Sequence, residues 1–255
     1  MTETLCKLSE TEVIKNIISE NLPYAETDFG KMIRSNIGLL FLKSHKVDTA
    51  KYLPLLGAAE LIHLSSLLHD DVIDNDDIRR GKPSIRSEYN NKTSVLYGDL
   101  ILSNALRLIL SYNSAELSEL FNATLNNMCR GELMQYAKTC SIPSTEEYIE
   151  KSRLKTASLF EFITEGINVI SEKKLHFPLE FGTNFGIGFQ IKNDLDNILK
   201  NKTDIRNGIY TAPVIFSGGV ELTNIGIEKT RCLIDNYRGR CMSFLSEFED
   251  SIYKE

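Results

Sequence analysis

The stretch from Leu64 to Gly81 reads LSSLLHDDVIDNDDIRRG, and it is the most informative segment of the chain. An apolar run leads into an acidic cluster and then a basic pair: Asp70, Asp71, Asp74, Arg79 and Arg80. If the run is helical through Asp74, the four-residue spacing places Asp70 and Asp74 on one face, about 6 Å apart at Cβ. Neighbouring carboxylates repel each other unless they share a cation, and hard divalent cations prefer oxygen ligands. The stretch therefore predicts either a metal site or a solvated acidic helix end.

The composition is that of a globular protein, with 255 residues, 42% hydrophobic and 25% charged. The net charge of -6 argues against a nucleic-acid partner held by general attraction to phosphate. Five scattered cysteines without a CxxC pair give no zinc signal and suit a reducing compartment. The first residues do not resemble a secretory leader, and we expect no transmembrane segment, so the expected location is cytoplasmic.

Apolar residues recur at helical spacing along most of the chain, and no segment alternates as a strand would. Ser9 with Glu12, and Ser144 with Glu147, have the spacing of capping boxes. We expect helices after Ser9, over 28–42, 54–74, 94–112, 115–138, 144–170 and 178–199, and from Pro213 to near Tyr253, with a loop over 201–208. The prediction is a single all-α domain over residues 1–255, with nine or ten helices.

Three kinds of metal site can be compared with the acidic cluster. An EF-hand loop fails, because Val72, Ile73 or Ile78 stands where an oxygen ligand is needed. A metal phosphohydrolase could use His69 with Asp70 but needs further histidines, and the chain has three others. The third kind is a magnesium-diphosphate clamp, in which carboxylates one turn apart hold ions that also bind phosphate oxygens. The spacing favours this third kind.

The segment HLSSLLHDDVIDNDDIRRGKPS resembles the first aspartate-rich motif of the trans-isoprenyl (polyprenyl) diphosphate synthases. Other pieces follow in the family's order: Gly30, Lys31 and Arg34 in FGKMIRS; Gly98 and Asp99; Gly131, Glu132 and Gln135; Lys155 and Thr156 in LKTASLF; Phe189 and Gln190 in GFQIKNDLDN; and DIRNGIYTAPVI from Asp204. The resemblance implies an isoprenoid-synthase-like bundle around a central cleft. It also implies condensation of an allylic diphosphate with isopentenyl diphosphate, a requirement for Mg²⁺, and a homodimer, with a heterodimer left open.

The resemblance also implies roles for individual residues. Asp70 and Asp74, supported by Asp71, would hold magnesium on the allylic diphosphate. The groups that neutralise phosphate oxygens would be Arg79, Lys155 and either Lys192 or Lys202. The metal-free isopentenyl diphosphate would be held by Lys31, Arg34, His63 and Arg80, while Thr156 and Gln190 would line the cleft near the forming cation. These residue types suit the chemistry, because an allylic diphosphate leaves as an anion and fixed positive groups stabilise that charge.

The chain departs from the family pattern in its second half. The second aspartate-rich motif reads NDLDN from Asn193, and only Asp194 keeps its place. Asp196 lies about 200° around a helix from Asp194, so the two cannot share an ion in regular geometry. Asn193 or Asp194, with Asn197, could still give a weaker metal site. Ile209 stands where the family usually has lysine, with Lys200 or Lys202 as candidate substitutes, and Ser35 replaces a proline.

Two functions follow from this contrast between the halves. One is an active prenyl diphosphate synthase, and the other is a weakened paralogue that serves as a non-catalytic or regulatory subunit of another synthase. A terpene cyclase is disfavoured, because a cyclase does not need the residues assigned to isopentenyl diphosphate. Ser65 and Ser66 occupy positions where bulky aromatics stop chain growth in the family. We therefore expect a geranylgeranyl or longer product.

Overall fold

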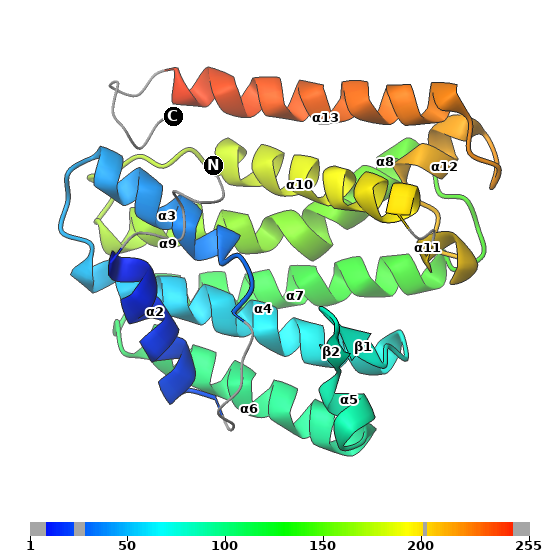
Figure 1. Ribbon diagram of the computed structural model, residues 1–255. Coiled ribbons are helices and arrows are strands. Elements are labelled where there is room, and N and C mark those ends of the chain that lie inside the picture. Colours follow the sequence, from blue (N-terminus) through cyan, green and yellow to red (C-terminus); the bar gives the residue numbers. More distant parts are fainter. Residues whose placement is uncertain (1–8, 23–28, 201–202, 247–255) are drawn as a thin grey trace. The chain divides into compact units, whose positions relative to one another are not determined.

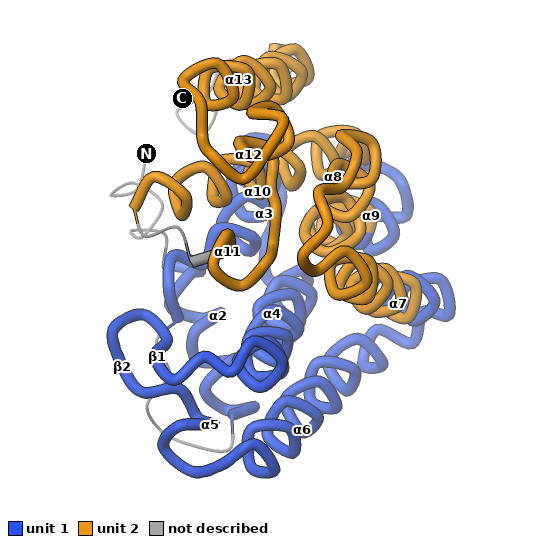
Figure 2. The backbone as a smooth tube through the Cα atoms, turned by 90° about the vertical axis from the view of Figure 1, so that its right-hand side faces the viewer, with its two compact units in different colours: residues 1–121, 166–175, 255 blue, residues 122–165, 176–254 orange. Residues whose placement is uncertain are grey.

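The computed structural model describes residues 9–22, 29–200 and 203–246, and most of these residues are helical (Figure 1). The expected all-α fold is thereby confirmed. The described residues form two compact units (Figure 2). The first unit contains the residues up to Phe121 together with Gly166–Leu175, and the second contains Asn122–Glu165 and the residues from His176 onward.

The first unit is organised around helix α4. Its elements are α2 (Ser9–Glu20), α3 (Ile33–Ser44), the 3-10 turn η1 (Ala50–Tyr52), α4 (Leu53–Ile73), strands β1 (Ile78–Arg79) and β2 (Lys82–Pro83), α5 (Ile85–Glu88) and α6 (Asn91–Leu110). Helix α4 packs against α2, α3 and α6, with Pro54 in its first turn. Because three helices cover it, α4 buries most of its circumference, including Leu55, Leu56, Ala58, Ala59, Leu61 and Ile62.

The second unit is organised around helix α10. Its elements are most of α7 (Ala115–Ala137), α8 (Thr145–Ser152), the π-helical turn η2 (Arg153–Ala157), most of α9 (Ser158–Ile170), α10 (Leu179–Lys200), α11 (Thr203–Arg206), α12 (Ala212–Ser217) and α13 (Asn224–Leu245). Helix α10 packs against η2 and α13. Its apolar core contains Tyr148, Ala157, Ile187, Ile191, Ala212 and Tyr237.

Several boundaries differ from those expected. Helix α3 begins at Ile33 rather than residue 28, because Gly30 and Met32 have positive φ, so Lys31 does not share a helical face with Arg34. A short hairpin and the small helix α11 replace expected loops, and α12 and α13 divide the last helix. The Ser144 capping box is confirmed. Ser9 instead lies inside α2, where its hydroxyl donates to Glu10, and Tyr253 lies outside the described residues.

Helix α6 is more apolar than the sequence analysis expected. Among the described residues it is the one helix long and apolar enough to cross a bilayer by length and composition, and 28% of that window is buried. One such helix is weak evidence for a membrane span, because core helices of water-soluble proteins meet the same criteria.

Candidate functional site

The acidic cluster lies at the C-terminal end of α4. The Asp74 amide donates to the Asp70 carbonyl at 2.8 Å, so the helical hydrogen-bond pattern continues through Asp74. This confirms the geometry on which the sequence argument rested. Both carboxylates are half-buried, and they end a helix whose other turns are packed in the core. The two side chains therefore share one helical face at the end of a rigid element.

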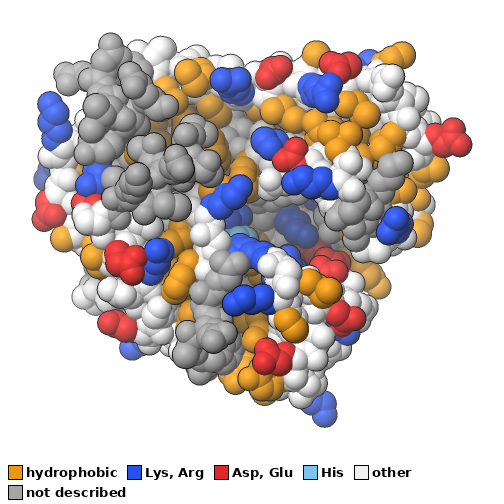
Figure 3. Space-filling model, in the orientation of Figure 1, with side chains coloured by type: hydrophobic (Ala, Val, Ile, Leu, Met, Phe, Trp, Pro, Cys, Tyr) orange, Lys and Arg blue, Asp and Glu red, His pale blue; other side chains and the backbone are white. Residues whose placement is uncertain are grey.

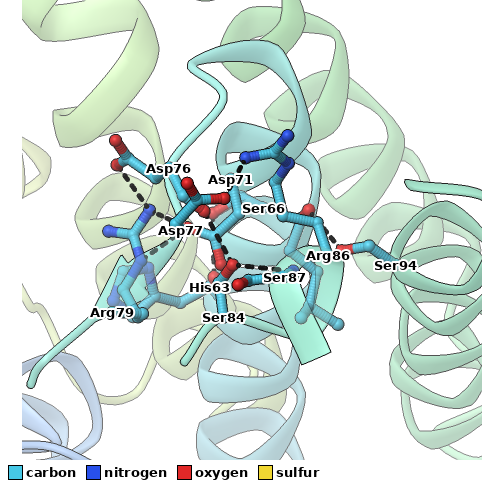
Figure 4. A network of polar contacts seen from close by, with 11 residues as sticks. His63, Ser66, Asp71, Asp76, Asp77, Arg79, Ser84, Arg86, Ser87 and Ser94 are labelled. Carbon is cyan, nitrogen blue, oxygen red and sulfur yellow. Dashed lines mark hydrogen bonds and ion pairs between the residues drawn. The ribbon is translucent and has the colours of Figure 1, made fainter. Parts of the chain in front are cut away.

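Asp71, between them, is held differently. It is 2% exposed, and its Oδ1 accepts hydrogen bonds from Arg79 through Nε at 2.7 Å and through Nη2 (Figure 4). Arg79 also lies 3.6 Å from Asp76. Burial raises the pKa of Asp71, and the Arg79 guanidinium opposes that rise. The Asp71 carboxylate thus fixes the orientation of Arg79.

The turn after α4 presents the two arginines. Arg80 and Gly81 have positive φ and form the two-residue turn that closes the β1–β2 hairpin. Ser84 Oγ donates to the Asp76 carbonyl at 2.6 Å, and Arg86 donates to Asp77 at 2.8 Å (Figure 4). These bonds tie both sides of the hairpin to the end of α4 and hold Arg79 and Arg80 close to the acidic cluster.

A group of cations surrounds His63. Burial, together with the charges of Arg34, Arg80 and Arg79, holds the pKa of His63 well below its ordinary value. Burial also lowers the pKa of Arg34, with Arg80 acting in the same direction and Glu60 opposing it. A Cβ at Gly30 would overlap the Arg80 guanidinium, so the glycine permits the close approach. Figure 3 shows basic side chains near a histidine on one face.

The expected residues of this first unit are thus mostly near one another. Arg34, Arg79 and Arg80 form a positive group around His63, and Lys31 lies exposed in the turn before α3. Such a concentration of positive charge is unfavourable by itself and is relieved when an anion binds.

The two serines before the acidic cluster have different surroundings. Ser65 is 2% exposed and donates to the Gly98 carbonyl on α6 at 2.8 Å. Ser66 is half-buried and donates to the carbonyl of His63 within its own helix at 2.8 Å. The contact of Ser65 with α6 leaves little space for a larger side chain.

In the second unit, η2 positions Lys155 and Thr156. A π-helical turn often marks a functional position, because it shifts the direction of the side chains that follow. A Cβ at Gly131 would overlap the Lys155 backbone, so this glycine lets α7 approach η2 closely. The Lys155 ammonium forms an ion pair with Glu132. Two of the quoted sequence pieces therefore meet here.

A chain of hydrogen bonds links η2, α10 and α8. Thr156 Oγ1 donates to Gln190 Oε1, Gln190 Nε2 donates to Asp194 Oδ1, and each bond is 2.6 Å long. Tyr148 donates to Asp194 Oδ2, also at 2.6 Å. Asp194 is 6% exposed. Its two oxygens are therefore engaged by an amide and a phenol, and Thr156 and Gln190 are held in one arrangement.

The rest of the second motif is arranged on the outer side of α10. Asn193 is exposed, and Asn197 donates to Asp204 at 2.6 Å. Asp196 forms a surface ion pair with Lys192 at 2.6 Å. Lys192 is therefore engaged elsewhere, and Lys202 lies outside the described residues.

The sequence analysis did not assign roles to Tyr148, Glu60 or Glu132. Tyr148 lies seven residues before Lys155, a spacing that could have suggested a shared helical face. Glu132 was quoted with Gly131 and Gln135 as part of a motif, without a role of its own. Their partners come from other helices, so spacing along the chain could not reveal these contacts.

Asp70 and Asp74 fit a magnesium ion only if a phosphate ligand also binds that ion. Across the described ranges, no three His, Cys, Asp or Glu side chains come together as a metal site. Asp70 and Asp74 supply two carboxylates, and Mg²⁺ is commonly held by one or two carboxylates together with substrate phosphates and waters.

Comparison with known proteins decides the family. The family model for polyprenyl synthetase matches residues 15–226. The chain belongs to the polyprenyl synthetase family. The chain is 31% identical to a decaprenyl-diphosphate synthase of Dictyostelium discoideum over 87% of its own length and 56% of the relative. It is 30% identical to a prenyl transferase of Cyanophora paradoxa over 85% of the chain and 71% of the relative.

Solved structures agree on the fold of this polyprenyl synthetase family member. A geranyltranstransferase of Thermotoga maritima is 27% identical with a TM-score of 0.77, covering 93% of the chain and 90% of that protein. A polyprenyl synthase of Caulobacter crescentus, complexed with calcium and isoprenyl diphosphate, has a TM-score of 0.83 at 21% identity, covering 100% of the chain and 94% of that protein. The latter likeness concerns the fold alone.

The chain is shorter than many of its relatives. It spans 56% of the Dictyostelium protein and 59% of a solanesyl-diphosphate synthase of Oryza sativa.

Proposed function

We propose that this chain transfers the prenyl group of an allylic diphosphate to isopentenyl diphosphate, head to tail and in the trans configuration. The observation that carries the proposal is the pairing of two kinds of anion site in the first unit. Asp70 and Asp74 suit a diphosphate that arrives with metal ions, and the group of Arg34, His63 and Arg80 suits a diphosphate without metal. A reaction with two diphosphate substrates needs both.

In the proposed reaction the allylic C–O bond breaks, and its electron pair leaves with the diphosphate. The isopentenyl double bond supplies the electrons of the new carbon–carbon bond, and loss of a proton from the isopentenyl unit balances the charge. Magnesium held by Asp70 and Asp74 would supply Lewis-acid stabilisation of the leaving group. Arg79, fixed by Asp71, contributes a positive charge that needs no reorganisation during the reaction.

Residues of the second unit have complementary roles in the proposal. Lys155 neutralises phosphate oxygens after releasing Glu132, and Thr156 and Gln190 present fixed dipoles to the developing cation. Asp194 acts by holding Gln190 in place. A weak contribution of Asn193, Asp194 or Asn197 to metal binding remains part of the prediction.

We further propose a product of geranylgeranyl length or longer. Ser65 and Ser66 put small side chains at the two positions before the acidic cluster where bulky aromatics stop chain growth in the family, and relatives are named as decaprenyl, hexaprenyl and solanesyl diphosphate synthases. The comparisons give no support to the alternative of a regulatory subunit. A homodimer and a cytoplasmic location stay predictions. Some relatives are named as mitochondrial or chloroplastic.

The test uses purified protein, Mg²⁺, labelled isopentenyl diphosphate and allylic primers of increasing length. We expect incorporation that is abolished by EDTA and reduced at least 100-fold in Asp70→Asn and Asp74→Asn. Asp196→Asn is the matched control, because Asp196 is paired with Lys192 on the surface. Absence of incorporation with every primer would refute the proposal and favour the subunit alternative.

A further inference from the structure

The second unit contains a cavity of about 230 Å³ whose lining includes none of the residues assigned above to substrate or metal. Residues of α7, of α8, of the segment between these helices and of the segment before α12 line it, among them Lys138, Tyr148, Lys151, Ile209 and Tyr210. Tyr148 is also one of the two residues that donate a hydrogen bond to Asp194. The cavity therefore shares a wall with the hydrogen-bond chain that fixes Gln190 and Thr156.

Lys151 is the unusual residue of this cavity. Lys151 is only 8% exposed, and its ammonium lies 4.8 Å from the centre of the Tyr148 ring. Within the described ranges, it makes neither a hydrogen bond nor an ion pair. A buried ammonium costs free energy unless it has a hydrogen-bonding or charged partner, and one aromatic face compensates only part of that cost.

In the part of the chain that the structure describes, the charged groups near Lys151 do not include a carboxylate that is available to pair with it. Burial lowers its pKa, Lys155 acts in the same direction, and Asp194, Glu132 and Asp204 oppose the change. Each of these three carboxylates already accepts a hydrogen bond or ion pair from another residue: Asp194 from Tyr148 and Gln190, Glu132 from Lys155, and Asp204 from Asn197.

A second lysine in the same cavity provides a comparison. Lys138 forms an ion pair with Glu147 at 2.7 Å, and its side chain is 43% exposed. Its charge is therefore satisfied by a neighbour and by water. Lys151 has neither a paired carboxylate among the described residues nor comparable exposure to water. It lies four residues before Lys155, and two neighbouring ammonium groups favour the binding of an anion between them.

We propose that Lys151 is an anion-binding residue and that this cavity receives a phosphate group of the diphosphate substrate. The inference deepens the proposed function and rests on it. Ile209, where the family pattern has lysine, lines the same cavity. Lys151 on α8 and Ile209 in the segment before α12 therefore line one cavity, the first with an ammonium and the second with an apolar side chain. The cation that the loop around Ile209 lacks is supplied by helix α8.

The test measures binding of inorganic pyrophosphate to the full chain by calorimetry, with and without Mg²⁺. We expect Lys151→Met to weaken binding at least tenfold and Lys138→Met to change it less than twofold. The double variant K151M/I209K moves the ammonium from α8 to the segment before α12 in the lining of the same cavity, and it should recover affinity to within threefold of wild type. A lysine with a purely structural role would not be rescued in this way.

A second variant guards against misfolding of Lys151→Met. Ile209→Asp leaves Lys151 in place and puts a carboxylate into the cavity, so pyrophosphate binding should again fall at least tenfold. Wild-type binding that is unchanged in both Lys151→Met and Ile209→Asp would overturn the inference. A wild type that binds pyrophosphate but incorporates no isopentenyl diphosphate would instead contradict the proposed function alone.

Discussion

The backbone amide and the hydroxyl of Ser35 both donate to the buried carboxylate of Glu60, at 2.9 Å and 2.8 Å. Ser35 stands in the first turn of α3, where helical amides have no partner within the helix, and Glu60 is 4% exposed in the middle of α4. The contact joins the segment that carries Arg34 to the helix that carries the acidic cluster. Ser35 is one of the positions where the chain departs from the family pattern, which has proline.

Restoring that proline should therefore destabilise this protein. Ser35→Pro removes both donors to Glu60, and we expect a loss of about 2–4 kcal/mol in the free energy of unfolding, because a buried carboxylate loses its hydrogen bonds. The proline ring itself is tolerated in a first helical turn. Ser35→Ala keeps the amide donor and should cost about 1 kcal/mol. Urea denaturation measures both, and equal losses in the two variants would contradict the role of the amide.

Gly131 should not tolerate a methyl group. In Gly131→Ala the new Cβ would overlap the Lys155 backbone, which cannot move without disturbing η2. We expect a loss of about 1–3 kcal/mol in stability and at least a tenfold loss of prenyl transfer. The matched control is Gly239→Ala in α13, where a Cβ meets nothing within 4 Å. That change should be neutral or stabilise by up to about 1 kcal/mol. Similar effects of the two changes would refute the close packing of α7 on η2.

His63 should make the protein less stable in mild acid. Burial and the charges of Arg34, Arg80 and Arg79 lower its pKa in the folded chain, whereas the unfolded chain titrates near the ordinary value of 6.5. As pH falls through 6.5, the unfolded state gains a proton that the folded state does not bind. The free energy of unfolding therefore decreases toward acid, with a slope that approaches about 1.4 kcal/mol per pH unit until the lowered pKa is reached.

Urea denaturation between pH 7.5 and 5 measures this slope. His63→Gln should reduce it, whereas the matched control His176→Gln, at an exposed position, should keep the wild-type slope. Pyrophosphate should also flatten the wild-type slope, because an anion beside the arginines raises the pKa of His63 in the folded state. If His63→Gln kept the full wild-type slope, His63 would not be the titrating group.

The two serines before the acidic cluster should respond differently to an aromatic substitution. Ser66→Phe is expected to shorten the product and leave the fold intact, because Ser66 is half-buried and bonds only within α4. Ser65→Phe removes the bond to Gly98 and places a ring against α6, so we expect a loss of about 2–4 kcal/mol in stability. Chromatography of the products and thermal unfolding measure the two effects. A farnesyl product from the wild type would contradict the prediction on length.

Most short-range patterns in the sequence were reliable where one element contains the whole feature, the Ser9 capping box being the exception. The spacing of Asp70 and Asp74, the capping box of Ser144 and the central position of α4 all depend on helical periodicity, and the structure confirms each. The start of α3 was predicted too early, because Met32 adopts a positive φ, which the identity of this residue does not predict.

By itself, the sequence determined the all-α fold, the family and the acidic helix end, because these follow from apolar periodicity and from motifs read along the chain. Only the tertiary structure decided which groups are already engaged: Asp71 by Arg79, Asp194 by Tyr148 and Gln190, and Glu60 by Ser35. The tertiary structure also showed that Lys138 is paired with Glu147, whereas Lys151 is buried. The physical reason is that burial and the choice of partner set the free energy of a charged group, and both come from residues distant in sequence.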